Sequence, residues 1–135
     1  MNDEARSLRT EQLCRAVARL RETLPELATN PLALDAAIQR FEFCYELSWK
    51  ALRAHLLAEG TSVANPREAF SRAYVQGWLE DEQSWLAMLA DRNRTSHTYD
   101  EALARQIGAR LPAHADRLHR LSLLLSARLR DGTID

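Results

Sequence analysis

The side chains best equipped for chemistry lie in one short stretch, DRNRTSHTYDE, which covers residues 91–101. Its five candidate site residues are Arg92, Asn93, Ser96, His97 and Tyr99. A guanidinium is permanently charged and pairs well with phosphate, and an imidazole with an ordinary pKa of about 6.5 transfers protons near neutral pH. These residue types favour binding of a phosphate-bearing ligand, or acid–base chemistry on one.

The spacing within this stretch predicts how the five side chains lie. If the preceding helix continues, the apolar face that carries Leu89 runs on through Arg92, Asn93 and Ser96. Arg92 and His97 are five residues apart, about 140° around a helix axis, so they are not direct neighbours. A shared site across a two-fold dimer would bring them together more easily. The alternative is a fraying helix end, which we favour for any one residue but not for the set.

A second polar set lies in FEFCYELSWKALR, residues 41–53. Glu42, Glu46 and Lys50 are spaced four residues apart, and Arg53 follows three residues later, so they can form ion pairs along one helix face. A solvated, salt-bridged face is the favoured interpretation of this spacing. Glu46 and Lys50 are retained as candidate supports for a binding site.

The remaining histidines and the cysteines do not indicate a metal site. His55, His114 and His119 stand singly in helical patterns, without carboxylate or cysteine companions at metal-ligand spacing, and are interpreted as packed or surface residues. Cys14 and Cys44 belong to no ligand motif and are expected to be reduced. With no glycine-rich phosphate loop either, the sequence predicts neither a metal nor a cofactor.

Composition limits the classes of partner. The 135 residues carry a formal net charge of -1, so there is no overall positive field to attract nucleic acid. Hydrophobic residues make up 46% and charged residues 27%, which is typical of a globular domain. No apolar run approaches membrane-spanning length. The sequence therefore predicts one domain over residues 1–135, located in the cytoplasm.

Almost every segment has helical periodicity, and the helix boundaries follow from capping residues. Asn30 and Asn65 each precede a proline and are good N-caps, Asp81 and Asp100 are further candidate caps, and Pro112 should kink or split the last helix. The predicted helices cover residues 8–27, 31–59, 66 to about 77, from about 82 into the polar stretch, and from about 101 to about 130. This pattern predicts an all-α, up-and-down four-helix bundle with an additional short helix.

Three sequence blocks identify a family. FEFCYELSWKALR, then NPREAF, then WLAMLADRNRTSHTYDE resemble the nucleotidyltransferase substrate-binding protein family, a branch of the HEPN superfamily (higher eukaryotes and prokaryotes nucleotide-binding). The order and spacing of the blocks agree over nearly the whole chain. The superfamily signature R-x4-6-H matches Arg92 and His97, and Tyr99 extends it to the form R-x4-H-x-Y.

The resemblance implies a HEPN-like bundle that forms a homodimer and pairs with a minimal nucleotidyltransferase subunit encoded nearby. The metal-binding aspartates and the transfer chemistry would belong to that other chain. This chain would be a non-catalytic subunit that binds nucleotide or substrate, as in some toxin–antitoxin pairs. Arg92 would contact phosphate, Asn93, Ser96 and His97 would complete the pocket, and Tyr99 would be a ligand contact or an acceptor for nucleotidyl transfer.

Two alternatives remain open. One is a metal-independent HEPN endoribonuclease toxin, in which His97 moves protons and Arg92 stabilises the phosphorane across a dimer. The acidic balance of the chain argues against a broad RNA-binding groove, although Arg94 and arginines of a partner protomer could form a local one. The other is a helical interaction module whose polar cluster only fixes the register of a dimer.

Overall fold

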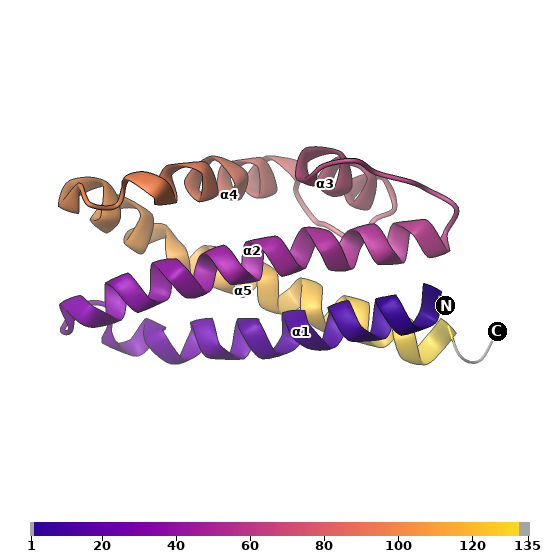
Figure 1. The fold of residues 1–135 in the computed structure, drawn as a ribbon, viewed down its shortest axis with the longest axis horizontal. Coiled ribbons are helices and arrows are strands. Elements are labelled where there is room, and N and C mark those ends of the chain that lie inside the picture. Colours follow the sequence, from indigo (N-terminus) through magenta and orange to yellow (C-terminus); the bar gives the residue numbers. More distant parts are fainter. Residues whose placement is uncertain (1, 133–135) are drawn as a thin grey trace.

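The computed structural model describes residues 2–132, and within them every regular element is a helix (Figure 1). The α-helices are α1 (Asn2–Thr23), α2 (Pro31–Ala58), α3 (Pro66–Val75), α4 (Glu82–Arg94) and α5 (Glu101–Gly132). Two short 3-10 helices follow α1 and α4: η1 (Leu24–Glu26) and η2 (Thr95–His97). Four main helices and the short α3 confirm the predicted fold class.

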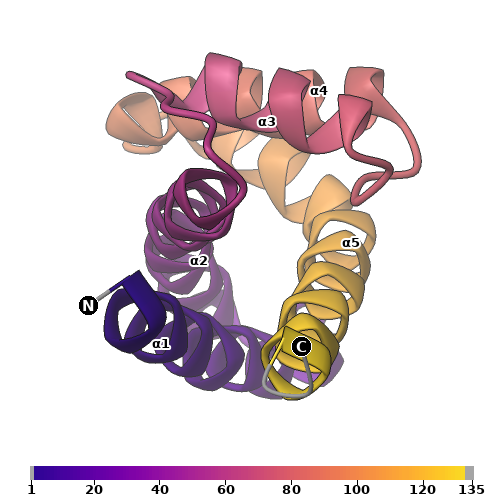
Figure 2. The ribbon, with the colours of Figure 1, turned by 90° about the vertical axis from the view of Figure 1, so that its right-hand side faces the viewer.

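The main helices alternate in direction along the bundle (Figure 1). Helices α1 and α2 pack against one another and both pack against α5. The end-on view shows α3 and α4 lying across one side of this group (Figure 2). Helix α2 also contacts α3 and α4, whereas α4 has few close backbone contacts with α5. The end of α4 therefore depends on side chains for its attachment to α5.

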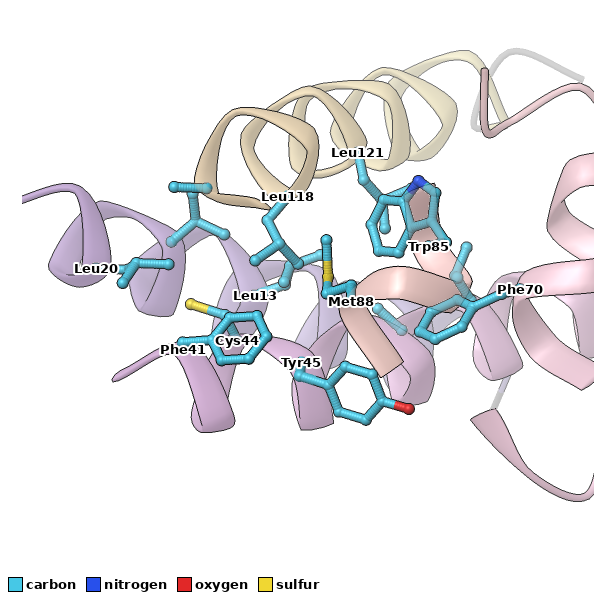
Figure 3. Packing of buried hydrophobic residues seen from close by; sticks show 14 of the residues in the cluster. Leu13, Leu20, Phe41, Cys44, Tyr45, Phe70, Trp85, Met88, Leu118 and Leu121 are labelled. Atoms are coloured by element: carbon cyan, nitrogen blue, oxygen red, sulfur yellow. The ribbon is translucent and has the colours of Figure 1, made fainter. Parts of the chain in front are cut away.

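A single cluster of buried hydrophobic residues draws on all five helices. Figure 3 shows its members from each: Leu13 and Leu20 of α1, Phe41, Cys44 and Tyr45 of α2, Phe70 of α3, Trp85 and Met88 of α4, and Leu118 and Leu121 of α5. Each large side chain of this kind contributes about 1.5–3 kcal/mol when it is fully buried. The interior face of every helix thus fixes its place in the bundle.

The predicted capping residues act as expected. Asn30, Asn65 and Asp81 accept hydrogen bonds from backbone N–H groups in the first turns of α2, α3 and α4, at 3.0, 3.0 and 3.2 Å. Asp100 does the same for α5, at 3.0 Å from the Ala102 nitrogen. These local bonds satisfy N–H groups that have no partner inside a helix.

Two predicted boundaries are wrong. The first helix begins at Asn2 rather than residue 8, and its α-helical part ends at Thr23 because Pro25 disfavours α geometry in the residue before it. Of the two effects predicted for Pro112, a kink or a split, the split does not occur, since α5 is one continuous helix with the proline on its exposed side. The axis of α5 changes direction along its length in Figure 1, as expected where a helix bends to accommodate a proline.

Among the described residues, the model contains no helix that combines the length and apolar character needed to cross a membrane.

Candidate functional site

The polar stretch forms a sharp corner rather than the end of a longer helix. Helix α4 stops at Arg94, and the next three residues form η2. Thr95 donates a hydrogen bond from its hydroxyl to the Arg92 carbonyl at 2.7 Å, and Thr98 donates to the Thr95 carbonyl at 3.0 Å. The expected continuation of one α-helical face through Ser96 is therefore wrong, because the tighter 3-10 turn changes the direction of each later side chain.

Arg92 is the candidate residue that faces inward. It is half-buried, and its guanidinium carbon lies 5.9 Å from the ring centre of Tyr45 on α2. The buried Arg92 Nε and the buried Tyr45 hydroxyl both lack hydrogen-bond partners among the described residues. Burial raises the pKa of Tyr45 to about 12 despite the opposing charge of Arg92. The arginine therefore lies over a ring face, and its buried Nε–H has no acceptor among the described residues.

The other four candidates of the stretch face outward. Asn93, Ser96, His97 and Tyr99 are all exposed, and Tyr99 is 84% exposed. The rings of His97 and Tyr99 meet edge to face, with their centres 6.1 Å apart. The end of α4 and the turn after it thus expose an imidazole, a phenol, an amide and a hydroxyl, while Arg92 lies against Tyr45 of α2. Joint binding by Arg92 and His97 remains a prediction.

The second polar set forms the expected ion pair on α2. Lys50 Nζ lies 3.5 Å from Glu46 Oε1, and both side chains are partly exposed. Arg53 lies over the Trp49 ring, 6.0 Å from its centre. Glu46 directly follows Tyr45, so the pair borders the surface on which Arg92 rests.

Asp91 is the residue that sequence reasoning missed. It is 1% exposed and accepts hydrogen bonds from Arg110 Nε at 2.8 Å and Arg110 Nη2 at 2.7 Å. It also accepts from His114 Nε2 at 2.7 Å and Arg94 Nη1 at 3.1 Å. His114 therefore has a carboxylate companion from another helix, which spacing along the sequence did not indicate. Its interpretation as a packed residue is confirmed.

Two spacings in the sequence could have located this network. Trp85, Met88, Asp91 and Thr95 recur every three or four residues and are all buried, so Asp91 lies on the inner face of α4. Arg110 and His114 are four residues apart and share one face of α5.

The charges within the network are set by burial and by direct contacts. Burial alone would raise the pKa of Asp91, but hydrogen bonds from Arg110 and His114 outweigh it and leave the pKa lowered. Burial lowers the pKa of His114, and the contact with Asp91 only partly opposes this. His114 Nδ1 is buried without a partner, so a second ring proton would be unsatisfied there. We therefore assign an ionised Asp91 and a neutral His114 that donates from Nε2.

Sequence and structure comparisons assign the chain to a family. The family model described as nucleotidyltransferase substrate binding protein like matches residues 8–127. The chain belongs to this family. The resemblance seen in the sequence blocks is thereby confirmed.

Individual relatives agree with the family assignment. A solved structure of HI0074 from Haemophilus influenzae, reported to reveal the fold of a substrate binding domain of a nucleotidyltransferase, has a TM-score of 0.79 at 26% identity. It covers 87% of this chain and 98% of its own. A crystal structure of a Thermus thermophilus protein has a TM-score of 0.69 at 43% identity and covers 86% of this chain and 97% of its own.

A relative named "Probable ribonuclease HepT", from Haemophilus influenzae, is 34% identical over 92 residues. The match spans 64% of this chain and 62% of that relative, which is less than two thirds of its length.

In this member of the substrate-binding family, two adjoining grooves flank the corner at Thr98. One has a volume of about 300 Å³ and is lined by Asp35, Ile38, Gln39, Glu42 and Thr98. The other, about 510 Å³, lies between the turn that joins α1 to α2 and the start of α5, and shares Asp35 and Thr98 with the first. Thr98 lies between His97 and Tyr99 in the sequence, but none of the candidate site residues lines either groove.

Proposed function

We propose that this chain is the non-catalytic, substrate-binding subunit of a two-component minimal nucleotidyltransferase, whose other chain performs the transfer. The observation that carries the proposal is the exposure of Asn93, Ser96, His97 and Tyr99 where the chain passes from α4 toward α5. These four exposed polar side chains contribute little to the stability of the bundle, and they are available to a ligand.

Within this proposal Arg92 contacts a phosphate of the nucleotide or substrate. Its guanidinium is only half-buried and has no ion-pair partner among the described residues, so the accessible part can form a charge-assisted hydrogen bond to a phosphate oxygen. Asn93, Ser96 and His97 add donors and acceptors around the same ligand. Glu46 and Lys50 support the site from α2, next to the Tyr45 ring that carries Arg92.

The proposed assembly includes a second copy of the chain. Arg92 faces α2 while His97 faces outward. One ligand would therefore contact both residue types more easily at an interface between two protomers. A homodimer that binds the nucleotidyltransferase subunit would present two such corners. Growth arrest caused by one chain and relieved by the other would extend the proposal to a toxin–antitoxin pair.

Tyr99 is the proposed site of modification by the partner. Its phenol oxygen would attack the α-phosphorus of a nucleoside triphosphate, pyrophosphate would leave, and the phenol proton would pass to a base or to water. An 84% exposed phenol can enter another protein's active site without unfolding of this chain.

Co-expression with the nucleotidyltransferase encoded beside this chain tests the proposal. The expected result is a stable complex that retains ATP or a small acceptor, with about tenfold weaker retention in Arg92→Ala and His97→Ala. His119→Ala is the matched control, since the His119 ring contacts Arg21 of α1, away from the corner. Failure to form a complex would overturn the proposal, and an unchanged mass at Tyr99 would remove only the modification step.

A ribonuclease is the second candidate, and the name of the HepT relative favours it. His97 would take the proton of a 2′-hydroxyl, whose oxygen attacks the adjacent phosphorus as the 5′-oxygen leaves with a proton from a second His97. Arg92 would stabilise the negative charge on the phosphorane. Under this alternative the wild type degrades a mixed RNA pool and His97→Ala does not. If the RNA stays intact with the wild type, the ribonuclease alternative is excluded. If the protein binds no ligand at all, the helical interaction module is favoured.

A further inference from the structure

The Asp91 network carries the free-energy cost of burying a charge. A carboxylate with an exposure of 1% has lost its water, and three donor side chains are needed to compensate it. Apolar residues of similar volume can often replace a buried ionic cluster with no loss of stability. The ionic cluster also constrains the orientation of its side chains, because hydrogen bonds depend on angle and apolar contacts do not.

The network fixes the last turn of α4 against two other helices. Arg110 binds both carboxylate oxygens of Asp91, at 2.7 and 2.8 Å, and so sets the plane of the carboxylate. The His114 ring that donates to Asp91 is stacked on Phe41 of α2, with ring centres 5.3 Å apart and planes 18° apart. Because α4 and α5 have few close backbone contacts, these side chains, together with the buried Met88 and Thr95, set the rotation of α4 at this end.

That rotation determines where the candidate site residues point. Arg92 follows Asp91, and its side chain leaves the helix about 100° further around the axis, toward Tyr45. The Arg92 carbonyl accepts the Thr95 bond that begins η2, so the turn that displays His97 starts from the same backbone. A small rotation of α4 would move both groups.

We propose that Asp91, together with Arg110 and His114, positions Arg92 against Tyr45 and sets the direction in which η2 displays His97. These three are positioning residues: they act on the ligand through Arg92 and His97 and do not touch it. The inference rests on the proposed function only for its binding readout.

To separate positioning from stability, the test replaces the three positioning residues with apolar ones. The triple variant Asp91→Leu, Arg110→Met, His114→Phe should fold, because it leaves no buried charge: Arg94, which also loses its partner, is half exposed to water. Its Arg92 Nε–H, buried in the wild type, should exchange with solvent at least about tenfold faster and show a shifted NMR resonance. In the complex with the partner chain, ATP should bind at least about tenfold more weakly.

The matched control is Thr10→Val, which removes a buried side-chain hydrogen bond, Thr10 to His55 at 2.9 Å, in another part of the bundle. It should leave the Arg92 exchange rate and the ATP affinity unchanged. A folded triple variant with the wild-type Arg92 exchange rate would overturn the proposal and would mean that the network only attaches α4 to α5. If the triple variant does not fold, Asp91→Asn, which keeps the shape and removes the charge, is measured in the same way. If the wild-type complex binds neither ATP nor a small acceptor, the proposed function fails, and the Arg92 signal alone still decides this inference.

Discussion

Asp91 and Arg92 are consecutive residues of α4 whose charged groups are held by different helices. The Asp91 carboxylate lies 2.7 Å from both Arg110 Nη2 and His114 Nε2 of α5. The Arg92 guanidinium lies over the Tyr45 ring of α2. The last turn of α4 is thus fixed from two sides, and changes on each side should have different effects.

Removal of one partner of Asp91 should destabilise the fold. In Arg110→Met the buried carboxylate loses two of its hydrogen bonds and retains only His114 and Arg94, so the free energy of unfolding should fall by about 2 kcal/mol. Urea unfolding at neutral pH measures the change. Arg105→Met is the control on the same helix, because its ion pair with Glu101 is exposed and should contribute less than about 0.5 kcal/mol. Equal effects of the two substitutions would show that Asp91 is not the source of the loss.

On the other side of α4, the Tyr45 hydroxyl should be dispensable for stability. It is buried and has no hydrogen-bond partner among the described residues, so Tyr45→Phe removes an uncompensated polar group and should raise the free energy of unfolding by about 1 kcal/mol. The burial that raises the pKa of Tyr45 to about 12 adds a pH effect. The unfolded chain loses this proton near pH 10 and the folded chain near 12, so stability should fall across that window in the wild type and less in Tyr45→Phe. A clear loss of stability in Tyr45→Phe at neutral pH would reveal a partner for the hydroxyl.

Whether a feature could be predicted from the sequence depends on how far apart its interacting residues lie along the chain. The capping residues Asn30, Asn65 and Asp81 act on backbone groups two or three residues away, so the local sequence was sufficient to place them. Apolar periodicity likewise gave the four main helices. Asp91 lies 19 and 23 residues from its partners Arg110 and His114, and that pairing depends on how α4 and α5 pack.

The corner at η2 was unpredictable for a related reason. A helix of residues 82–97 and a helix that tightens into a 3-10 turn after Arg94 have the same apolar pattern up to Leu89. The turn is stabilised by the Thr95 and Thr98 hydroxyls, which compete with the helix for nearby carbonyls. The types of the candidate site residues were evident from the sequence, and their directions were not.

His55 should make the fold sensitive to mild acid. It is fully buried, and burial first, then the charges of Arg128 and Arg6, lower its pKa to about 4. The unfolded chain takes up a proton as the pH falls through about 6.5, while the folded chain does not until about 4, so stability is lost within this window. Between about pH 7 and about pH 5 the wild type should lose about 2 kcal/mol more than His55→Gln, measured by urea unfolding. Parallel losses in the two proteins would show that His55 is protonated equally in both states.

Substitution of His97 should separate function from stability. Its side chain is exposed and touches the edge of the Tyr99 ring, so His97→Ala should change the free energy of unfolding by less than about 0.5 kcal/mol. The same substitution should weaken retention of the ligand in the partner complex, because the imidazole belongs to the displayed surface and not to the core. Arg110→Met differs from His97→Ala because it should lower stability, and under the positioning inference it should also weaken retention of the ligand. A loss above about 1 kcal/mol in His97→Ala would mean that the imidazole is packed in solution, and the exposed corner would then no longer support a binding site.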